Sequence, residues 1–465
     1  MAAANTRNLI GLSGVPLVMV LGNSMLIPVL PTMKAKLDLT SFETSFLITA
    51  FSIAAGIVIP FAGYLSDRFS RKIVVIMGLS LYGLGGLLAG LSALWWDSYA
   101  MIMVGRIMQG IGAAGTAPIA MALVGDLFNG ADESRALGLL ETSNGLGKVL
   151  SPIFGSLLAL IAWYMVFLAF PAICGLVLLL FLFLVKEKKQ KKEPKPVKQY
   201  VHSISQVFKQ HGKWLIPAFF IGSICLFTLF GVLFYLSDLL EDRYKIDGVI
   251  KGGFLAIPLL VMSITAYVTG LIIKKKLKLM RLFVIVGMVL LAASYVIASF
   301  MESAYTLIAV LVIGSLGTGM ILPCLNSMII GAVKKDERGM ITSLYSGVRF
   351  IGVAIGPPVF TWLLGYSKTV MFYSIAGLSA LFAIVAFIWL KPQMAGGSQS
   401  KQHQQEDEKQ EKQEVFEAFD QVAHILQLKE ESQEEKKRAE AEKSIGFDVD
   451  DLIDHLLKKQ KEKGH

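Results

Sequence analysis

The sequence predicts an all-α membrane protein with twelve transmembrane helices in two six-helix repeats, followed by a partly helical cytoplasmic tail. Three observations predict this fold: the composition, the number of long apolar segments, and a repeat of Gly and Pro positions. The 465-residue chain is 54% hydrophobic and only 17% charged, whereas soluble proteins carry roughly a quarter charged residues. The composition therefore argues against a soluble enzyme, a nucleic-acid-binding protein and a secreted disulfide scaffold. Cys174, Cys225 and Cys324 each lie within an apolar run, so we expect no metal site and no disulfide framework.

Twelve apolar segments are long enough to cross a bilayer, which takes about 20 helical residues. They lie near residues 9–33, 43–65, 73–94, 98–123, 136–161, 164–185, 213–237, 249–273, 281–300, 304–331, 338–366 and 369–390. The first is too long for a signal peptide and has Pro28 and Pro31 near its end. We therefore expect it to remain as the first spanning helix.

Lys and Arg are concentrated in the loops after the second, fourth, sixth, eighth and tenth helices. The positive-inside rule then places both termini in the cytoplasm of a multi-pass plasma-membrane protein. Charge also divides along the chain, with 32 Lys+Arg against 17 Asp+Glu in residues 1–393 and 12 against 18 in residues 394–465. We expect an N-terminal six-helix bundle at 1–185, a basic cytoplasmic linker at 186–212, a C-terminal bundle at 213–393, and an acidic cytoplasmic tail at 394–465.

The tail contains two apolar stripes at helical spacing, in residues 415–426 and 445–457. They predict two cytoplasmic helices, the second of which docks on the basic loops or on a soluble protein partner. A flexible, solvated tail is the alternative.

The two halves of the membrane part repeat at one fixed offset. Gly112 and Pro118 correspond to Gly317 and Pro323, and a second Gly and Pro pair in the fifth helix corresponds to one in the eleventh, all 205 residues apart. Frequent Gly and Pro in transmembrane helices does not by itself predict a common offset. The repeat predicts two parallel halves with a substrate site between them, near the middle of the membrane.

The turn between the second and third helices combines one acid and three bases. Its defining residues are Gly63, Asp67, Arg68, Arg71 and Lys72. This pattern resembles the loop signature of the major facilitator superfamily, with Ser70 where a second Gly is usual. The resemblance implies that Asp67 contacts the start of the eleventh helix, where a carboxylate meets the positive end of the helix dipole, and that this contact gates access. Alternatively, the bases only set topology. The equivalent turn at residues 270–278 lacks the acid.

Two further segments resemble motifs of the same superfamily. In the fourth helix these residues are Arg106, Gln109, Gly110 and Gly112. Arg106 should face a cavity or a partner, because facing lipid is costly; snorkelling to the surface is the alternative. The antiporter motif comprises Gly147, Ser151, Pro152 and Gly155 in the fifth helix and Gly352, Gly356 and Pro357 in the eleventh. Together these motifs resemble those of the twelve-helix drug:proton antiporters, which implies the major facilitator fold.

Charged residues well inside the spans are the candidates for proton coupling: Arg106, Glu141, Lys148 and Arg349. Residues 144–149 only faintly resemble a phosphate-binding loop, so we expect no ATP and no cofactor, and a proton gradient as the energy source. Glu141 is the principal candidate, since burial would raise its pKa and a nearby base would lower it as the halves move. It lies seven residues, about 10.5 Å, before Lys148. Alternatively, it reaches the cytoplasmic surface and only helps the helix to fold.

Candidate residues of the substrate cavity come from the first, seventh and tenth helices: Asn23, Phe227, Phe230, Phe234 and Asn326. An aromatic wall suits amphipathic organic molecules, although the same rings could face lipid. The sequence thus predicts a secondary transporter, not an enzyme, that exports drugs or similar small organic compounds in exchange for protons. A specific exporter of a metabolite, lipid or peptide is one alternative. A transport-inactive receptor or scaffold acting through its tail is another.

Overall fold

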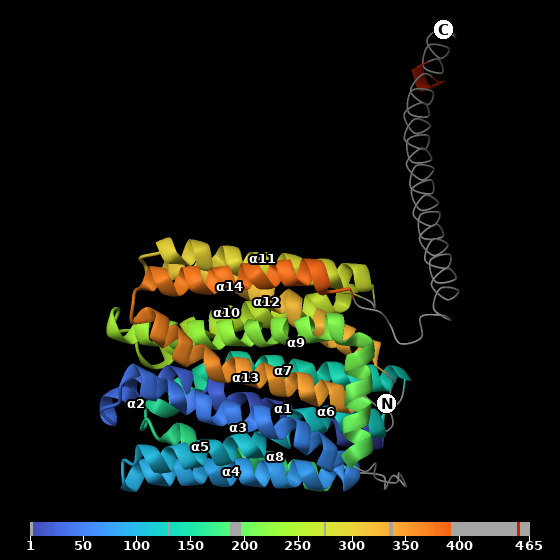
Figure 1. Ribbon diagram of the computed structural model, residues 1–465, viewed down its shortest axis with the longest axis horizontal. Helices are drawn as coiled ribbons and strands as arrows, with labels where there is room; N and C mark the ends of the chain where they lie inside the picture. Colours follow the sequence, from blue (N-terminus) through green and yellow to red (C-terminus); the bar gives the residue numbers. More distant parts are fainter. Residues whose placement is uncertain are drawn as a thin grey trace, which may run out of the picture. The chain divides into compact units, whose positions relative to one another are not determined.

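Long apolar segments of this chain form helices because a helix satisfies its own backbone hydrogen bonds, which lipid cannot do. The computed structural model describes residues 3–128, 130–186, 197–273, 276–333, 338–391 and 453–455. Figure 1 shows its helices packed side by side along a common direction. They are α1 (Ala3–Ser24), η1 (Ile27–Val29), α2 (Leu30–Lys36), α3 (Ser41–Arg68), α4 (Arg71–Trp95), α5 (Tyr99–Ala114), α6 (Ala117–Leu127), α7 (Gly130–Ala159), α8 (Met165–Leu184), α9 (Val197–Asp242), α10 (Gly248–Ile273), α11 (Leu277–Phe300), α12 (Ala304–Ala332), α13 (Arg338–Leu364) and α14 (Lys368–Trp389).

Two of the spans are broken helices. The first span consists of α1, η1 and α2, and Pro28 and Pro31 lie at the starts of the two short helices that follow its break. The fourth span consists of α5 and α6, with Pro118 at the start of α6. Proline has no backbone N–H, so it is tolerated in the first turn of a helix and disrupts a helix interior. With each broken helix counted as one span, the described residues contain the twelve predicted spans.

Eleven of these spans are long and apolar enough to cross a bilayer by composition alone. The exception is α7, whose sequence includes Glu141, Asn144 and Lys148. It packs against α1 and α10, so protein covers two of its sides. The seventh span also differs from its predicted bounds: α9 begins at Val197, so residues 197–212 of the expected linker are the first turns of a long helix. Residues 187–196 of that linker lie outside the described part of the chain.

The packing repeats between the halves as the Gly and Pro offsets predict. In the first half α1 packs on α7, α3 on α5, and α4 on α5 and α8; in the second half α9 packs on α13, α10 on α12, and α11 on α12 and α14. The repeated glycines occupy equivalent positions: Gly112 lies against Gly78 of α4, and Gly317 lies against Gly287 of α11. Small residues let neighbouring backbones approach closely, which explains why these positions are retained in both halves.

Two helix pairs make the most extensive contacts between the halves. Along the pair α3 and α13, Thr49 Oγ1 donates to Ala354 O at 2.6 Å, Gly56 lies beside Gly347, and Gly63 lies beside Ser343. Along the pair α7 and α10, Gly252 lies against the backbone of Pro152. In Figure 1, α13 lies between α9 and α3, which are its partners in the two halves.

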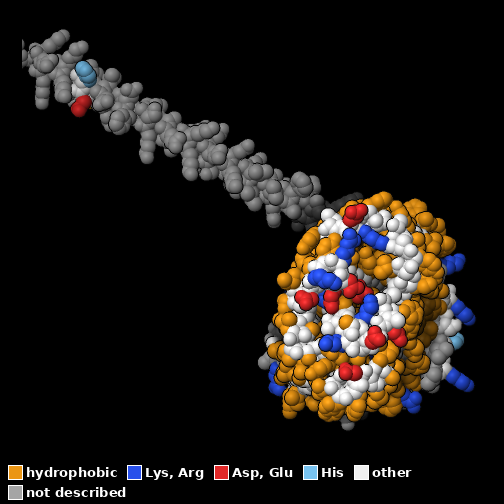
Figure 2. All heavy atoms as spheres, turned by 90° about the vertical axis from the view of Figure 1, so that its left-hand side faces the viewer, with side chains coloured by type: hydrophobic (Ala, Val, Ile, Leu, Met, Phe, Trp, Pro, Cys, Tyr) orange, Lys and Arg blue, Asp and Glu red, His pale blue; other side chains and the backbone are white. Residues whose placement is uncertain are grey.

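The two ends of the bundle differ. We call the end that carries the α3–α4 turn the linker end, and the end that carries α2 the opposite end. Figure 2 looks onto the opposite end, where apolar side chains form the rim and acidic and basic side chains gather towards the middle. Large apolar side chains such as Phe61, Phe183 and Phe387 are strongly exposed around the bundle, as expected for a surface that faces lipid.

Residues 396–465 form a separate unit. Its described residues, 453–455, are helical and exposed. They fall within the second predicted tail helix; the rest of both predicted tail helices lies outside the described residues.

Candidate functional site

A buried arginine is the centre of a polar network in the first half. The Arg106 side chain has no exposed surface. Its Nε donates to Leu47 O at 2.9 Å, its Nη1 to Gly22 O at 3.0 Å and Gln109 Oε1 at 2.7 Å, and its Nη2 to Asn23 Oδ1 at 2.6 Å. This one side chain therefore ties α5 to α1 and α3.

Asn23 extends the network, since its Nδ2 donates to Ser52 Oγ at 2.7 Å. The Phe51 ring covers the Arg106 guanidinium, with 4.6 Å between the guanidinium carbon and the ring centroid. Arg106 thus does not snorkel to the membrane surface but faces protein partners, as a desolvated charge requires. Asn23, which we predicted to line the substrate cavity, uses both ends of its amide within this network.

The charged turn between α3 and α4 forms a second network, at the linker end. Arg71 bridges two carboxylates, at 3.0 Å to Asp67 Oδ1 and 2.8 Å to Asp126 Oδ2, and also donates to the carbonyl of Ala122. A Cβ on Gly339, in the first turn of α13, would lie 4.0 Å from Asp67 Oδ2. The structure therefore brings Asp67 next to the start of the eleventh span, where the resemblance places it.

The other residues of this turn make hydrogen bonds to nearby groups. Arg68 donates to Tyr64 Oη at 3.2 Å, and Lys72 donates to the Leu182 carbonyl at the end of α8 at 3.1 Å. The Ser70 side chain accepts from the Ile73 N–H and caps α4. This cap explains why Ser serves where the superfamily usually has Gly, because Ser is a preferred N-cap residue.

The first turns of α9 add a residue to this network that the sequence did not predict. The Tyr200 and Tyr64 rings meet edge to face, 5.0 Å between centroids. Burial, and then the nearby Asp67 and Tyr64, raise the pKa of Tyr200 above its usual value. The helix that leads into the second half thereby packs beside the charged α3–α4 turn of the first half.

The small residues of the antiporter motif form close helix contacts within each half. Gly155 of α7 lies against the Met25 backbone, and Gly356 of α13 lies against the Phe227 backbone. Gly147 and Gly352 make the corresponding contacts, with Leu17 and Ser223 respectively. Of the remaining members, Ser151 donates to the Gly147 carbonyl, and Pro152 and Pro357 lie inside their helices. Gly110 of the fourth-helix motif lies against the Phe51 carbonyl of α3.

The candidate coupling residues of α7 and α13 lie apart from the Arg106 network. Lys148 is half-buried and within electrostatic range of Glu141 on its own helix and of Arg349 on α13. Glu141 is exposed and accepts from Asn144 Nδ2 at 3.2 Å. The burial that we expected for Glu141 is therefore not observed, because its position on α7 leaves the carboxylate exposed. Its coupling role remains a prediction.

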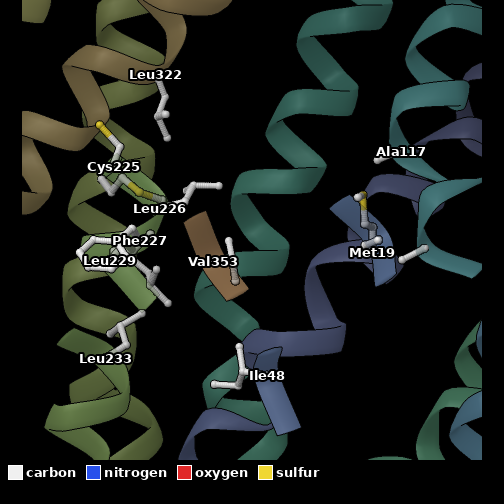
Figure 3. Packing of buried hydrophobic residues seen from close by; sticks show 14 of the residues in the cluster. Met19, Ile48, Ala117, Cys225, Leu226, Phe227, Leu229, Leu233, Leu322 and Val353 are labelled. Atoms are coloured by element: carbon white, nitrogen blue, oxygen red, sulfur yellow. The ribbon is translucent and has the colours of Figure 1, made fainter. Parts of the chain in front are cut away.

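The predicted cavity residues divide into buried and half-buried positions. Phe227 and Phe234 are buried, and Phe230 and Asn326 are half-buried. Phe227 packs against Phe360, 5.8 Å between ring centroids. Figure 3 shows the region between the halves, with Leu226, Phe227 and Leu322 on one side and Met19 and Ala117 on the other. The side chains drawn there are apolar. The role of these residues in a substrate cavity remains a prediction.

Charged residues at the opposite end were missed by the sequence. Lys251, near the start of α10, is 2% exposed and pairs with Glu241 of α9. Asp238 lies within electrostatic range of Lys34 on α2 and of Lys251, and the adjacent Ser237 donates to Ile27 O at 2.9 Å. These contacts join the halves at the opposite end. The sequence signal that could have identified them is Asp238, an acid directly after the predicted end of the seventh helix at residue 237.

Comparison with known proteins agrees with this architecture. The profile of the Major Facilitator Superfamily matches residues 12–301 and 280–430. The bacillibactin exporter of Bacillus subtilis (strain 168) is 48% identical over 383 residues, which cover 82% of this chain and 94% of that protein. The multidrug efflux protein YfmO of the same organism is 24% identical over 378 residues, 81% of this chain and 91% of that protein.

A solved structure has the same fold. It is a bacterial homolog of the human lysosomal transporter Spinster, in an inward-facing and unoccupied conformation, with a TM-score of 0.70 and 15% sequence identity. The match covers 85% of this chain and all of that one.

Proposed function

The chain belongs to the Major Facilitator Superfamily of membrane transporters, and from this premise we propose that it exports one specific small metabolite of the siderophore class. The observation that carries the proposal is the 48% identity to the bacillibactin exporter over 94% of that protein's length. Identity to the multidrug efflux protein, over a similar length, is only 24%. The alternative of a specific metabolite exporter is therefore better supported than the broad drug export that the motifs first favoured.

Alternating access is the mechanism that we propose, with the linker end in the cytoplasm. Rocking of the halves about α3–α13 and α7–α10 requires contacts at each end that can break and form again. At the linker end the candidates are Asp67 beside the start of α13 and Tyr200 beside Tyr64. At the opposite end they are Ser237 with the Ile27 carbonyl and the charges around Asp238.

We further propose that a proton gradient drives export. Proton coupling needs a carboxylate that changes its surroundings between states. Glu141 meets this requirement if closure at the linker end covers its exposed side chain, which lies two helical turns from Lys148.

Transport in inverted membrane vesicles tests the function. With an acid lumen, vesicles containing the protein should accumulate metal-free bacillibactin, and a protonophore should abolish the accumulation. Ethidium and tetraphenylphosphonium, tested in parallel, represent the drug-export alternative. Uptake of these cations without uptake of bacillibactin would overturn the proposal. If a well-inserted protein took up none of these compounds, the result would favour the alternative of a transport-inactive receptor or scaffold.

A further inference from the structure

Two cations from different halves share the region between the halves. Lys148 lies in the middle third of α7 and Arg349 in the middle third of α13. Both are half-buried and within electrostatic range of each other. Because α7 belongs to the first half and α13 to the second, each half contributes one of the two positive charges.

Neither cation forms an ion pair among the described residues. Lys148 makes no ion pair and no hydrogen bond there, and the Nε of Arg349 is buried without a hydrogen-bond partner. The guanidinium of Arg349 lies over the Tyr345 ring, with 5.3 Å between the guanidinium carbon and the ring centroid. Glu141, the charged neighbour of Lys148 on α7, forms no ion pair with it.

The other buried or half-buried cations at functional positions are satisfied by protein. Arg106 has four hydrogen bonds to oxygen acceptors, Lys251 pairs with Glu241, and Arg71 bridges Asp67 and Asp126. A membrane protein pays heavily for an unpaired charge within the bilayer, and two like charges in range of each other raise that cost. Lys148 and Arg349 therefore differ in kind from the cations that hold the fold together.

We propose that Lys148 and Arg349 form an anion-binding subsite of the transport pathway, which binds an acidic oxygen group of the exported organic molecule. One bound anion would neutralise two charges and would be held by both halves at once. Binding would then draw α7 and α13 together, which links substrate binding to closure. The Tyr345 ring positions the guanidinium through a cation–π contact.

The subsite specifies the charge of the exported molecule. It rests on the proposed function only for the identity of that molecule. A siderophore binds ferric iron, a hard cation that prefers ionisable oxygen donors, so its metal-free form is acidic. The two cations select for this charge class and against the organic cations that many drug exporters carry. The inference about charge would hold for any organic acid that the protein exports.

Binding to the purified, full-length protein in detergent tests the subsite. The probes are metal-free bacillibactin, benzoate as a simple organic anion, benzamide as its neutral isostere, and benzylamine as a cation. The anions should bind in competition with one another, and the neutral and cationic probes should bind at least ten-fold more weakly. Lys148→Gln and Arg349→Gln should each weaken anion binding about ten-fold or more, the range of one charge-assisted hydrogen bond.

The variants separate a binding role from a structural one. Lys148→Arg keeps the charge and should retain most of the binding. Lys213→Gln, at an exposed lysine of α9, is the matched control and should change nothing. Because the cations are unpaired, Lys148→Gln should leave the melting temperature of the ligand-free protein unchanged or raised, whereas a structural role predicts a loss.

The outcomes distinguish this inference from the proposed function. Anion binding that depends on both cations, without bacillibactin export, supports the subsite and overturns the proposed cargo. Bacillibactin export that is unchanged in Lys148→Gln and Arg349→Gln overturns the subsite and leaves the cargo standing. Equal binding of benzoate, benzamide and benzylamine also overturns the subsite.

Discussion

Replacement of Arg106 by Met tests how strongly the buried network holds the first half together. Met fills a similar volume but removes the donors that serve four acceptors on α1, α3 and α5. Each hydrogen bond lost contributes about 1 kcal/mol, so the loss is about 4 kcal/mol. Removal of a desolvated charge offsets part of it, which leaves a net destabilisation of about 2–4 kcal/mol.

The measurement is the melting temperature of the purified protein in detergent, followed by tryptophan fluorescence. With an unfolding entropy of about 2 cal/mol/K per residue, the helical unit should melt about 2–5 °C lower in Arg106→Met. Arg243→Met, at an exposed arginine after α9, is the matched control and should stay within about 0.5 kcal/mol of the parent. An unchanged melting temperature for Arg106→Met would refute the claim that this network supports the fold.

Three other substitutions test the packing, the gate and the coupling. Gly155→Val should prevent correct folding, because a Cβ there meets the Met25 backbone, whereas Gly377→Val, with open space around it, should be tolerated; size-exclusion profiles of the two variants in detergent compare them. Asp67→Asn should reduce the transport rate several-fold with little change in expression, since Arg71 keeps its second carboxylate; normal vesicle transport would contradict the gating role. Glu141→Gln should abolish accumulation against a gradient and its pH dependence; wild-type rate and pH profile would place coupling elsewhere.

The sequence predicted the fold well because the signals for it are local and repeated. Bilayer-length apolar runs, Pro28, Pro31 and Pro118 at helix breaks, and a common offset between Gly pairs each depend on a few neighbouring residues. The predicted helix bounds were less accurate where polar residues continue a helix beyond its apolar part. Residues 197–212 extend α9 beyond its apolar part, and hydrophobicity alone does not register such an extension.

The site was harder to predict because its contacts join distant segments. The sequence identified Arg106 as a charge that must have partners, but the backbone carbonyls of Gly22 and Leu47 have no signature of their own. Lys251 and Asp238 were missed because they lie at helix ends, where charges usually reach water. Glu141 was expected to be buried because of its sequence position, and only the packing of α7 shows that its side chain is exposed.

The buried and half-buried cations differ in whether protein acceptors satisfy their charge. Arg106 is surrounded by acceptors within one half, so it can move with that half through the whole cycle without losing a bond. Lys148 and Arg349 lie in different halves without acceptors, so their electrostatic energy changes whenever the halves move. A ligand can shift a conformational equilibrium only by its differential affinity for the two states. An anion held by both cations in the proposed subsite would have that differential affinity, because a movement that separates α7 from α13 would take one of the two charges away from it.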